Sequence, residues 1–93
     1  MDFDYEAGRF YKNDDTGKLL AEVTFDTFAN GRAYAINHTF VRDDQRGKGL
    51  AAQLIKVVVD KAIAEDKKIL PLCSYARAQF DKNPEYQAIE YKE

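Results

Sequence analysis

The sequence contains one cysteine, one histidine, two prolines and no tryptophan. A single cysteine cannot form an intramolecular disulfide, and one cysteine with one histidine does not supply a conventional structural zinc site, so we predict no metal centre. Apolar runs such as residues 57–59 are too short to cross a membrane. No basic segment followed by an apolar run opens the sequence, and we therefore expect no signal peptide and a cytoplasmic location.

A strong charge of either sign is also missing. Fourteen Lys and Arg residues against 16 Asp and Glu residues give a formal net charge of −2. This balance argues against nucleic-acid binding, and we predict neither a nucleic-acid nor a membrane partner. The chain has 93 residues, 45% of them hydrophobic and 32% charged, a globular composition. We expect one domain over residues 1–93.

The first half of the chain alternates between polar and apolar residues, which is typical of half-buried strands. Residues 3–12, rich in Phe and Tyr, predict a first strand, and residues 20–26 predict a second. Asn30-Gly31 is a strong hairpin signal before a third strand at residues 32–41. The alternation assigns one face of this third strand to Tyr34, Ile36, His38 and Phe40. The result is a three-stranded antiparallel meander.

The second half changes period. Apolar residues at positions 51, 54, 55, 58 and 62 predict a central helix from Leu50 to about Asp66. Residues 69–73 predict a short fourth strand, and Ser74 is a candidate N-cap for a short C-terminal helix that ends at Asn83-Pro84. A right-handed crossover makes the fourth strand parallel to the third. The fold class is therefore α+β.

The turn between the third strand and the central helix reads Arg46-Gly47-Lys48-Gly49. The first turn of a helix exposes backbone N–H groups that have no intrahelical partner. None of the candidate cap residues here has a side-chain oxygen, and two cations stand at the positive end of the helix dipole. Both features suit a bound anion, and the glycines allow it to approach the backbone closely. The sequence therefore predicts a phosphate-binding turn.

Three phosphate-binding patterns compete for this turn. A P-loop requires Ser or Thr after Gly-Lys, but Gly49 follows Lys48. The dinucleotide fingerprint matches formally from Gly47 to Ala52, but it belongs after the first strand of a larger parallel sheet. The third pattern fits: Arg46-x-x-Gly49-x-Ala51 resembles the Gln/Arg-x-x-Gly-x-Gly/Ala motif of the GCN5-related N-acetyltransferases, and it stands between a meander strand and the central helix as it does in that family.

Residues 5–87 resemble the compact, single-domain subgroup of this family. The resemblance implies a truncated GNAT-like fold and acetyl-coenzyme A (acetyl-CoA) as cosubstrate. It also implies that the third and fourth strands splay apart to admit the thioester. The pantetheine arm would pair with the backbone of Thr39, Phe40 and Val41. The pyrophosphate would lie on the turn and first helical turn, formed by Arg46, Gly47, Lys48, Gly49, Leu50, Ala51 and Ala52.

The chain departs from the family pattern in three ways. The two helices that usually wall the acceptor site are absent, residues 32–41 contain no carboxylate base, and the usual Tyr acid falls near Phe80. His38 and Cys73 are the candidate substitutes. His38 is either a base or a satisfied core histidine. Cys73 is a proton donor, a transient acyl carrier or a small buried residue, and Tyr75 is a donor to the coenzyme sulfur or a core residue.

We therefore predict an acetyl-CoA-dependent N-acetyltransferase acting on an unidentified amine, such as a small amine or a protein lysine. A non-catalytic acyl-CoA-binding module would also need the cofactor turn, but it would not need His38 or Cys73. A protein-interaction domain with a vestigial pocket would have no cofactor affinity. A homodimer could supply the missing acceptor wall.

Overall fold

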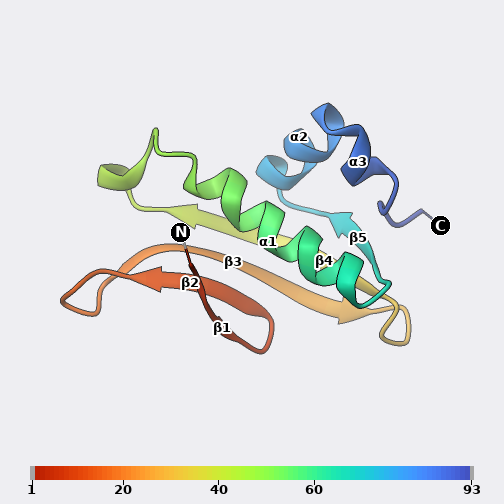
Figure 1. Ribbon diagram of the computed structural model, residues 1–93, viewed down its shortest axis with the longest axis horizontal. Helices are drawn as coiled ribbons and strands as arrows, with labels where there is room; N and C mark the ends of the chain where they lie inside the picture. The colour runs from red at the N-terminus through yellow and green to blue at the C-terminus, as the bar shows by residue number, and fades with distance from the viewer. Residues whose placement is uncertain (1, 93) are drawn as a thin grey trace.

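The computed structural model describes residues 2–92. They form a single five-stranded sheet and helices that pack on one of its faces (Figure 1). The strands follow chain order across the sheet, β1-β2-β3-β4-β5, with antiparallel pairing up to β4 and parallel pairing between β4 and β5. The α+β class, the central helix and the parallel β4–β5 pair confirm the prediction. The elements are β1 Asp4–Glu6, β2 Arg9–Asn13, β3 Leu19–Phe28, β4 Ala33–Val41, the 3-10 turn η1 Asp43–Gln45, α1 Leu50–Ala64, β5 Lys68–Pro71, α2 Ser74–Lys82 and α3 Pro84–Gln87.

The meander holds four strands where the sequence pattern predicts three. Residues 3–12 divide into β1 and β2, which pair as a hairpin that turns at Gly8. Gly8 has φ of 81°, a conformation that glycine adopts without steric cost. Its carbonyl accepts a hydrogen bond from Phe25 N at 2.9 Å, which fixes the hairpin against β3. A single aromatic-rich run therefore conceals two short strands.

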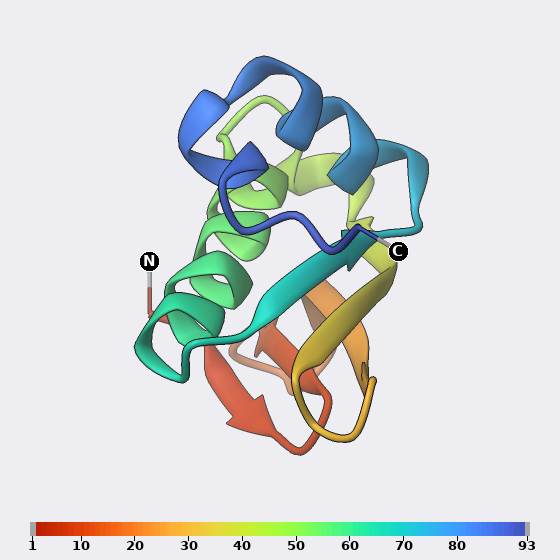
Figure 2. The ribbon, with the colours of Figure 1, turned by 90° about the vertical axis from the view of Figure 1, so that its right-hand side faces the viewer.

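The hydrophobic core lies between the sheet and α1. The predicted stripe on α1 is buried at Leu54, Ile55, Val58 and Ala62. Ala21, Val23 and Phe25 of β3 face this stripe, as the alternation predicts. α2 adds Ala76 and Phe80 to the same core, so both long helices cover the same face of the sheet (Figure 2). The opposite face of the sheet, called the outer face below, is left uncovered by the helices.

A β-bulge in β4 changes which residues reach the core. Phe25 pairs with Ile36 and Thr24 pairs with His38, so Asn37 is an extra residue on β4. Tyr34 and Ile36 are buried before the bulge, whereas His38 and Phe40 are exposed after it. The prediction that these four side chains share one face is therefore wrong. One inserted residue shifts the alternation by one position, and His38 moves to the outer face.

The C-terminal segment differs from the prediction in the N-cap of its first helix. Cys73, not Ser74, is the N-cap of α2, and its sulfur accepts a hydrogen bond from Ala76 N at 3.4 Å. Pro84 begins the short α3, as proline does at a first helical position. Residues 89–91 return along β5 through a parallel bridge between Ile69 and Glu90. Within residues 2–92, no helix has the length and hydrophobicity needed to cross a membrane.

Candidate functional site

The turn that precedes α1 has the backbone geometry expected of an anion site. Gly47 and Gly49 both have left-handed backbone angles, with φ of 83° and 76°. Gly49 is the N-cap of α1, no side chain caps the helix, and no acidic residue occupies its first turn. The amide N–H groups of Leu50, Ala51 and Ala52 precede the first intrahelical donor, Gln53, which donates to Gly49 O at 3.1 Å. The positive end of the helix dipole therefore faces outward with its donors uncapped.

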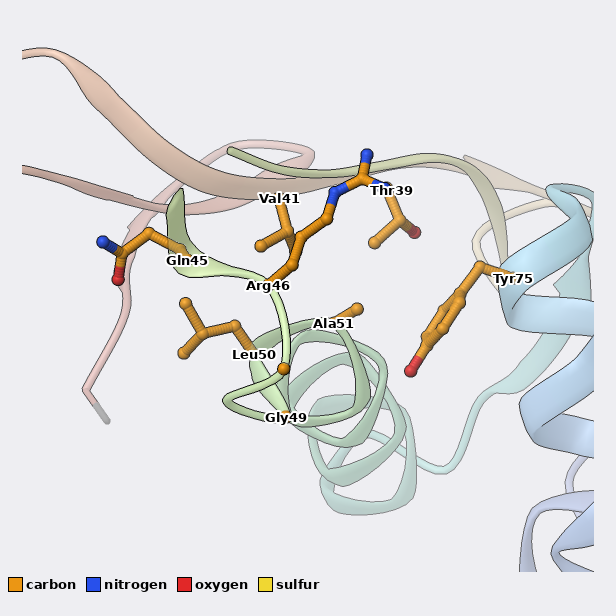
Figure 3. A pocket seen from close by; sticks show the side chains of 9 residues that line it. Thr39, Val41, Gln45, Arg46, Gly49, Leu50, Ala51 and Tyr75 are labelled. Atoms are coloured by element: carbon orange, nitrogen blue, oxygen red, sulfur yellow. The ribbon is translucent and has the colours of Figure 1, made fainter. Parts of the chain in front are cut away.

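This turn opens into a cavity of about 360 Å³ between β4, α1 and α2. Gly49, Leu50 and Ala51 border it at the start of α1, and Tyr75 of α2 lies on the side opposite Gln45 (Figure 3). A methyl group built on Gly47 would have no heavy atom within 4 Å. The cavity is lined by Thr39, Val41, Gln45, Arg46, Gly47, Gly49, Leu50, Ala51 and Tyr75.

Arg42 fixes the loop that carries the turn. Its guanidinium contacts Asp44 at 2.7 Å and reaches back to Asp14, in the β2–β3 loop, at 2.9 Å. These hydrogen bonds lower the pKa of both carboxyl groups, so both stay charged and hold the loop at neutral pH. Arg46 is left largely exposed, with 72% of its side chain accessible and a 3.2 Å contact to Asp43. A cation is therefore available beside the uncapped helix terminus.

β4 offers an open backbone edge next to this cavity. β5 pairs with β4 only from Ala33 to Ile36. Beyond that point the amides of Leu72 and Cys73 both donate to Ile36 O, at 2.9 and 3.1 Å, and the chain turns away into α2. Within residues 2–92, no strand pairs with the β5-side edge of residues 38–41. The predicted splay is present, and the backbone of Thr39 to Val41 is free to pair with an extended ligand.

Cys73 lies at the base of the splay on the helix side. Its sulfur is 3.4 Å from Thr39 Oγ1, across the gap between β5 and β4. The side chain is half-buried and packs against the core. The structure therefore brings Cys73 to the predicted location, but it also gives the sulfur a structural task, because the same atom caps α2.

Tyr75 lines the cavity and stands two residues after Cys73, in the first turn of α2. The residue is 37% exposed, so it is not a core residue. The hydroxyl oxygen accepts a hydrogen bond from Gln79 Nε2 at 3.1 Å, and Gln79 itself is buried. This contact orients the phenol and leaves its own proton available for donation into the cavity. Phe80 is fully buried and takes no part in the cavity.

The structure separates His38 from the other two candidates. The bulge at Asn37 directs Thr39 and Val41 toward the cavity and His38 toward the outer face of the sheet. The His38 side chain is 54% exposed, so it is not a core histidine. Its Nε2 lies 3.3 Å from Glu22 Oε2 on β3. His38 and Cys73 therefore stand on opposite sides of the splayed strands.

The sequence pattern missed three residues near the site. Gln45 lines the cavity, with its side-chain oxygen 3.3 Å from Lys48 Nζ. Asn37 forms the bulge, accepting from Thr24 Oγ1 at 2.6 Å and donating to Asp26 at 2.8 Å. Glu22 is the third missed residue. Its only signal in the sequence was its place among the polar residues that alternate along β3. Among residues 2–92, no group of three or more His, Cys, Asp or Glu side chains is arranged to hold a metal ion.

The chain is similar to known proteins in sequence and in fold. Protein NATD1 of chicken (Gallus gallus) is 33% identical over 64 residues, which cover 69% of this chain and 58% of that protein. The chain thus matches little more than half the length of that relative. The NMR structure of a GCN5-like N-acetyltransferase candidate from Staphylococcus aureus is 32% identical, with a TM-score of 0.79 over 99% of this chain and 89% of the other.

A more distant neighbour was solved with a ligand. A predicted acetyltransferase from Clostridium acetobutylicum, determined with acetyl-CoA, has a TM-score of 0.60 and 19% identity over 80% of this chain and 54% of the other. At that identity the likeness concerns the fold alone. The family model of the GCN5-related N-acetyltransferases matches residues 9–89. Because this match spans most of the chain, which also has an uncapped helix terminus beside two splayed strands, the chain belongs to the GCN5-related N-acetyltransferase family.

Proposed function

We propose that residues 1–93 form a single acetyltransferase domain that transfers an acetyl group from acetyl-CoA to a primary amine. The observation that carries this proposal is the continuity of three features: the uncapped terminus of α1, the cavity and the open edge of β4. Taken together, the three features suit one extended ligand that carries a diphosphate, a pantetheine arm and a thioester. Membership of the GCN5-related N-acetyltransferase family supports acetyl-CoA as the cosubstrate.

Each part of the cosubstrate has a chemical counterpart on the chain. The amides of residues 47–52 would donate to the pyrophosphate, with Arg46 and Lys48 adding positive charge. The edge of Thr39, Phe40 and Val41 would pair with the amides of pantetheine as a strand does. The acetyl group would then lie where β4 and β5 diverge, near Cys73 on the helix side and His38 on the outer side.

The transfer requires three proton movements. His38 accepts one proton from the acceptor ammonium, and the neutral amine attacks the acetyl carbonyl carbon. The C–N bond forms as the C–S bond breaks, and the electron pair goes to sulfur. The amine loses its second proton to solvent, while Cys73 or Tyr75 supplies one to the departing thiolate and is reprotonated from solvent. The products are an amide and coenzyme A thiol, with one net proton released to solvent. A transient acetyl group on the Cys73 thiolate is the alternative role of that residue.

An amide chemical-shift titration with acetyl-CoA tests the binding step residue by residue. We expect saturable shifts at residues 47–52 together with residues 39–41. Ala51→Leu fills part of the cavity and should weaken binding by about tenfold or more, equivalent to ~1.4 kcal/mol. Ala64→Leu makes the same change at the exposed far end of α1 and is the matched control, with unchanged affinity.

The outcomes separate the candidate functions. Binding followed by acetylation of amines, in a panel that includes Nα-acetyl-lysine methylamide and spermidine, supports the enzyme. Saturable binding without turnover on any amine would favour the acyl-CoA-binding module. No shift at millimolar acetyl-CoA would overturn both and leave the interaction domain.

A further inference from the structure

We propose that Glu22 is a positioning residue for His38: it keeps the imidazole proton on Nε2 and so makes Nδ1 the base that faces the acceptor amine. This inference deepens the proposed function and rests on it for the role of His38. The juxtaposition itself, a carboxylate on β3 beside the single histidine of the chain on β4, is independent of any cosubstrate.

The acceptor must reach the acetyl group from the outer face of the sheet. On the helix side, the cavity beside the divergence of β4 and β5 is the proposed site of acetyl-CoA, and α2 covers its base, with Cys73 against Thr39 and Ala76 and Phe80 in the core. Within residues 2–92, no helix covers these strands on the outer face (Figure 2). Because of the bulge at Asn37, the side chain of His38 stands on this open face beside the divergence. His38 therefore lies on the route of the acceptor.

Glu22 is held in place by contacts other than the one to His38. Its Oε1 accepts a hydrogen bond from Arg9 Nε at 2.7 Å, and the carboxylate is only 18% exposed. Arg9 is fixed in turn by Glu6 at 3.0 Å and by the ring of Tyr11, whose centroid is 4.0 Å from its guanidinium carbon. The second oxygen, Oε2, remains for His38. The carboxylate is thus preorganised across three strands before the imidazole meets it.

This placement determines which ring nitrogen carries the proton. A neutral imidazole has one N–H and one lone pair, and an adjacent negative charge favours the proton on the nearer nitrogen. The nearer nitrogen is Nε2, which leaves the lone pair on Nδ1. When Nδ1 takes a proton from the acceptor, Glu22 also stabilises the resulting imidazolium. Arg9 on β2 and Glu6 on β1, the charged groups beyond Glu22, modulate this effect without contacting the ring.

Nuclear magnetic resonance of the ring nitrogens tests the assignment directly, because one histidine gives one set of signals. In the wild-type protein we expect the neutral ring to be mainly the Nε2–H tautomer. Glu22→Gln should raise the fraction of the Nδ1–H tautomer, because the anion that favours a proton on Nε2 is lost. Asp26→Asn is the matched control: it removes an outer-face carboxylate that contacts Asn37 rather than His38, and it should leave the tautomer unchanged.

Kinetics provide the second test, with Nα-acetyl-lysine methylamide as the acceptor. Glu22→Gln should lower kcat roughly tenfold, by analogy with the low end of the cost of removing a carboxylate that orients a metal-ligating imidazole. It should leave the affinity for acetyl-CoA unchanged. In a His38→Gln background, Glu22→Gln should have no further effect on kcat.

Two results would overturn the inference: a predominantly Nδ1–H ring in the wild-type protein, or a His38 tautomer unaffected by Glu22→Gln. Failure of the proposed function would look different. In that case acetyl-CoA would not bind and no variant would be active, while the ring signals would still report whether Glu22 controls the imidazole. A kcat that is unchanged by Glu22→Gln in an active enzyme would reject the positioning role alone.

Discussion

The sulfur of Cys73 has two tasks that a single substitution can separate. It accepts the hydrogen bond from Ala76 N that caps α2, and it faces Thr39 at the base of the splay. A hydroxyl is a good helix cap, but it is neither a thiolate nor a comparable proton donor. The structural and the chemical roles of this position therefore respond differently to serine and to alanine.

We predict that Cys73→Ala lowers the free energy of unfolding by roughly 0.5–1 kcal/mol, because the cap is lost. Cys73→Ser should retain the wild-type stability. Urea unfolding measures both. If the thiol takes part in transfer, both variants lose activity with acetyl-CoA binding intact. A fully active Cys73→Ser protein would restrict this residue to capping α2, and proton donation to the coenzyme sulfur would fall to Tyr75.

At the scale of the elements, the turn at Gly8 controls how the β1–β2 hairpin sits on β3. A Cβ at this position would lie 3.0 Å from Phe25 O, closer than nine in ten real Cβ contacts. Gly17, in the β2–β3 turn, has a similar φ of 86°, but a Cβ there would meet nothing within 4 Å. The two glycines share the backbone requirement and differ in the space around them.

Alanine at either glycine should therefore be destabilising, to different extents. The left-handed backbone costs a residue with a Cβ roughly 1–2 kcal/mol, and we expect Gly17→Ala to show that cost alone. Gly8→Ala should cost more, because β3 must also move away from the hairpin. Equilibrium unfolding of both variants gives the comparison. Equal losses would mean that the contact with Phe25 relaxes freely.

These elements also mark how far the sequence pattern reaches. The stripe on α1 and the alternation on β3 are periodic signals, and most of the positions they single out are buried, although Ala51 is only half-buried. The bulge at Asn37 leaves no periodic signal, because it is a tertiary adjustment between β3 and β4. It alone reverses the predicted faces of His38 and Thr39. The uncapped turn before α1 was predictable because its two glycines and missing cap are local features, whereas the partner of His38 lies on another strand.

At the scale of the whole molecule, ion pairs join elements that are distant in the sequence. Arg77 on α2 holds Glu90 of the tail with two hydrogen bonds, at 2.8 and 2.9 Å. Glu65, just after α1, accepts hydrogen bonds from Lys61 and from the hydroxyl of Tyr34 on β4. Arg77 lowers the pKa of Glu90, and Lys61 together with Tyr34 lowers the pKa of Glu65 to about 2. Protonation of these carboxylates must therefore weaken the folded state.

The sign of the pH dependence follows from these lowered pKa values. Glu65 binds a proton more readily in the unfolded chain, where its pKa is near 4.5, than in the folded protein, where it is about 2. Its contribution to stability is thus complete above the unfolded value and disappears as the pH falls toward the folded value. We predict that the urea midpoint decreases across this window, and that Glu65→Gln makes the decrease shallower while lowering stability at neutral pH.

Glu85→Gln is the control for this prediction, because it removes an exposed carboxylate of the same type from the start of α3. It should leave the slope across the window nearly unchanged. A Glu65→Gln protein with the wild-type slope would show that the contacts to Lys61 and Tyr34 do not distinguish the folded from the unfolded state. The acid sensitivity would then come from the other carboxyl groups whose pKa is lowered in the folded protein. Among these, Asp14 and Glu90 join the most distant segments of the chain.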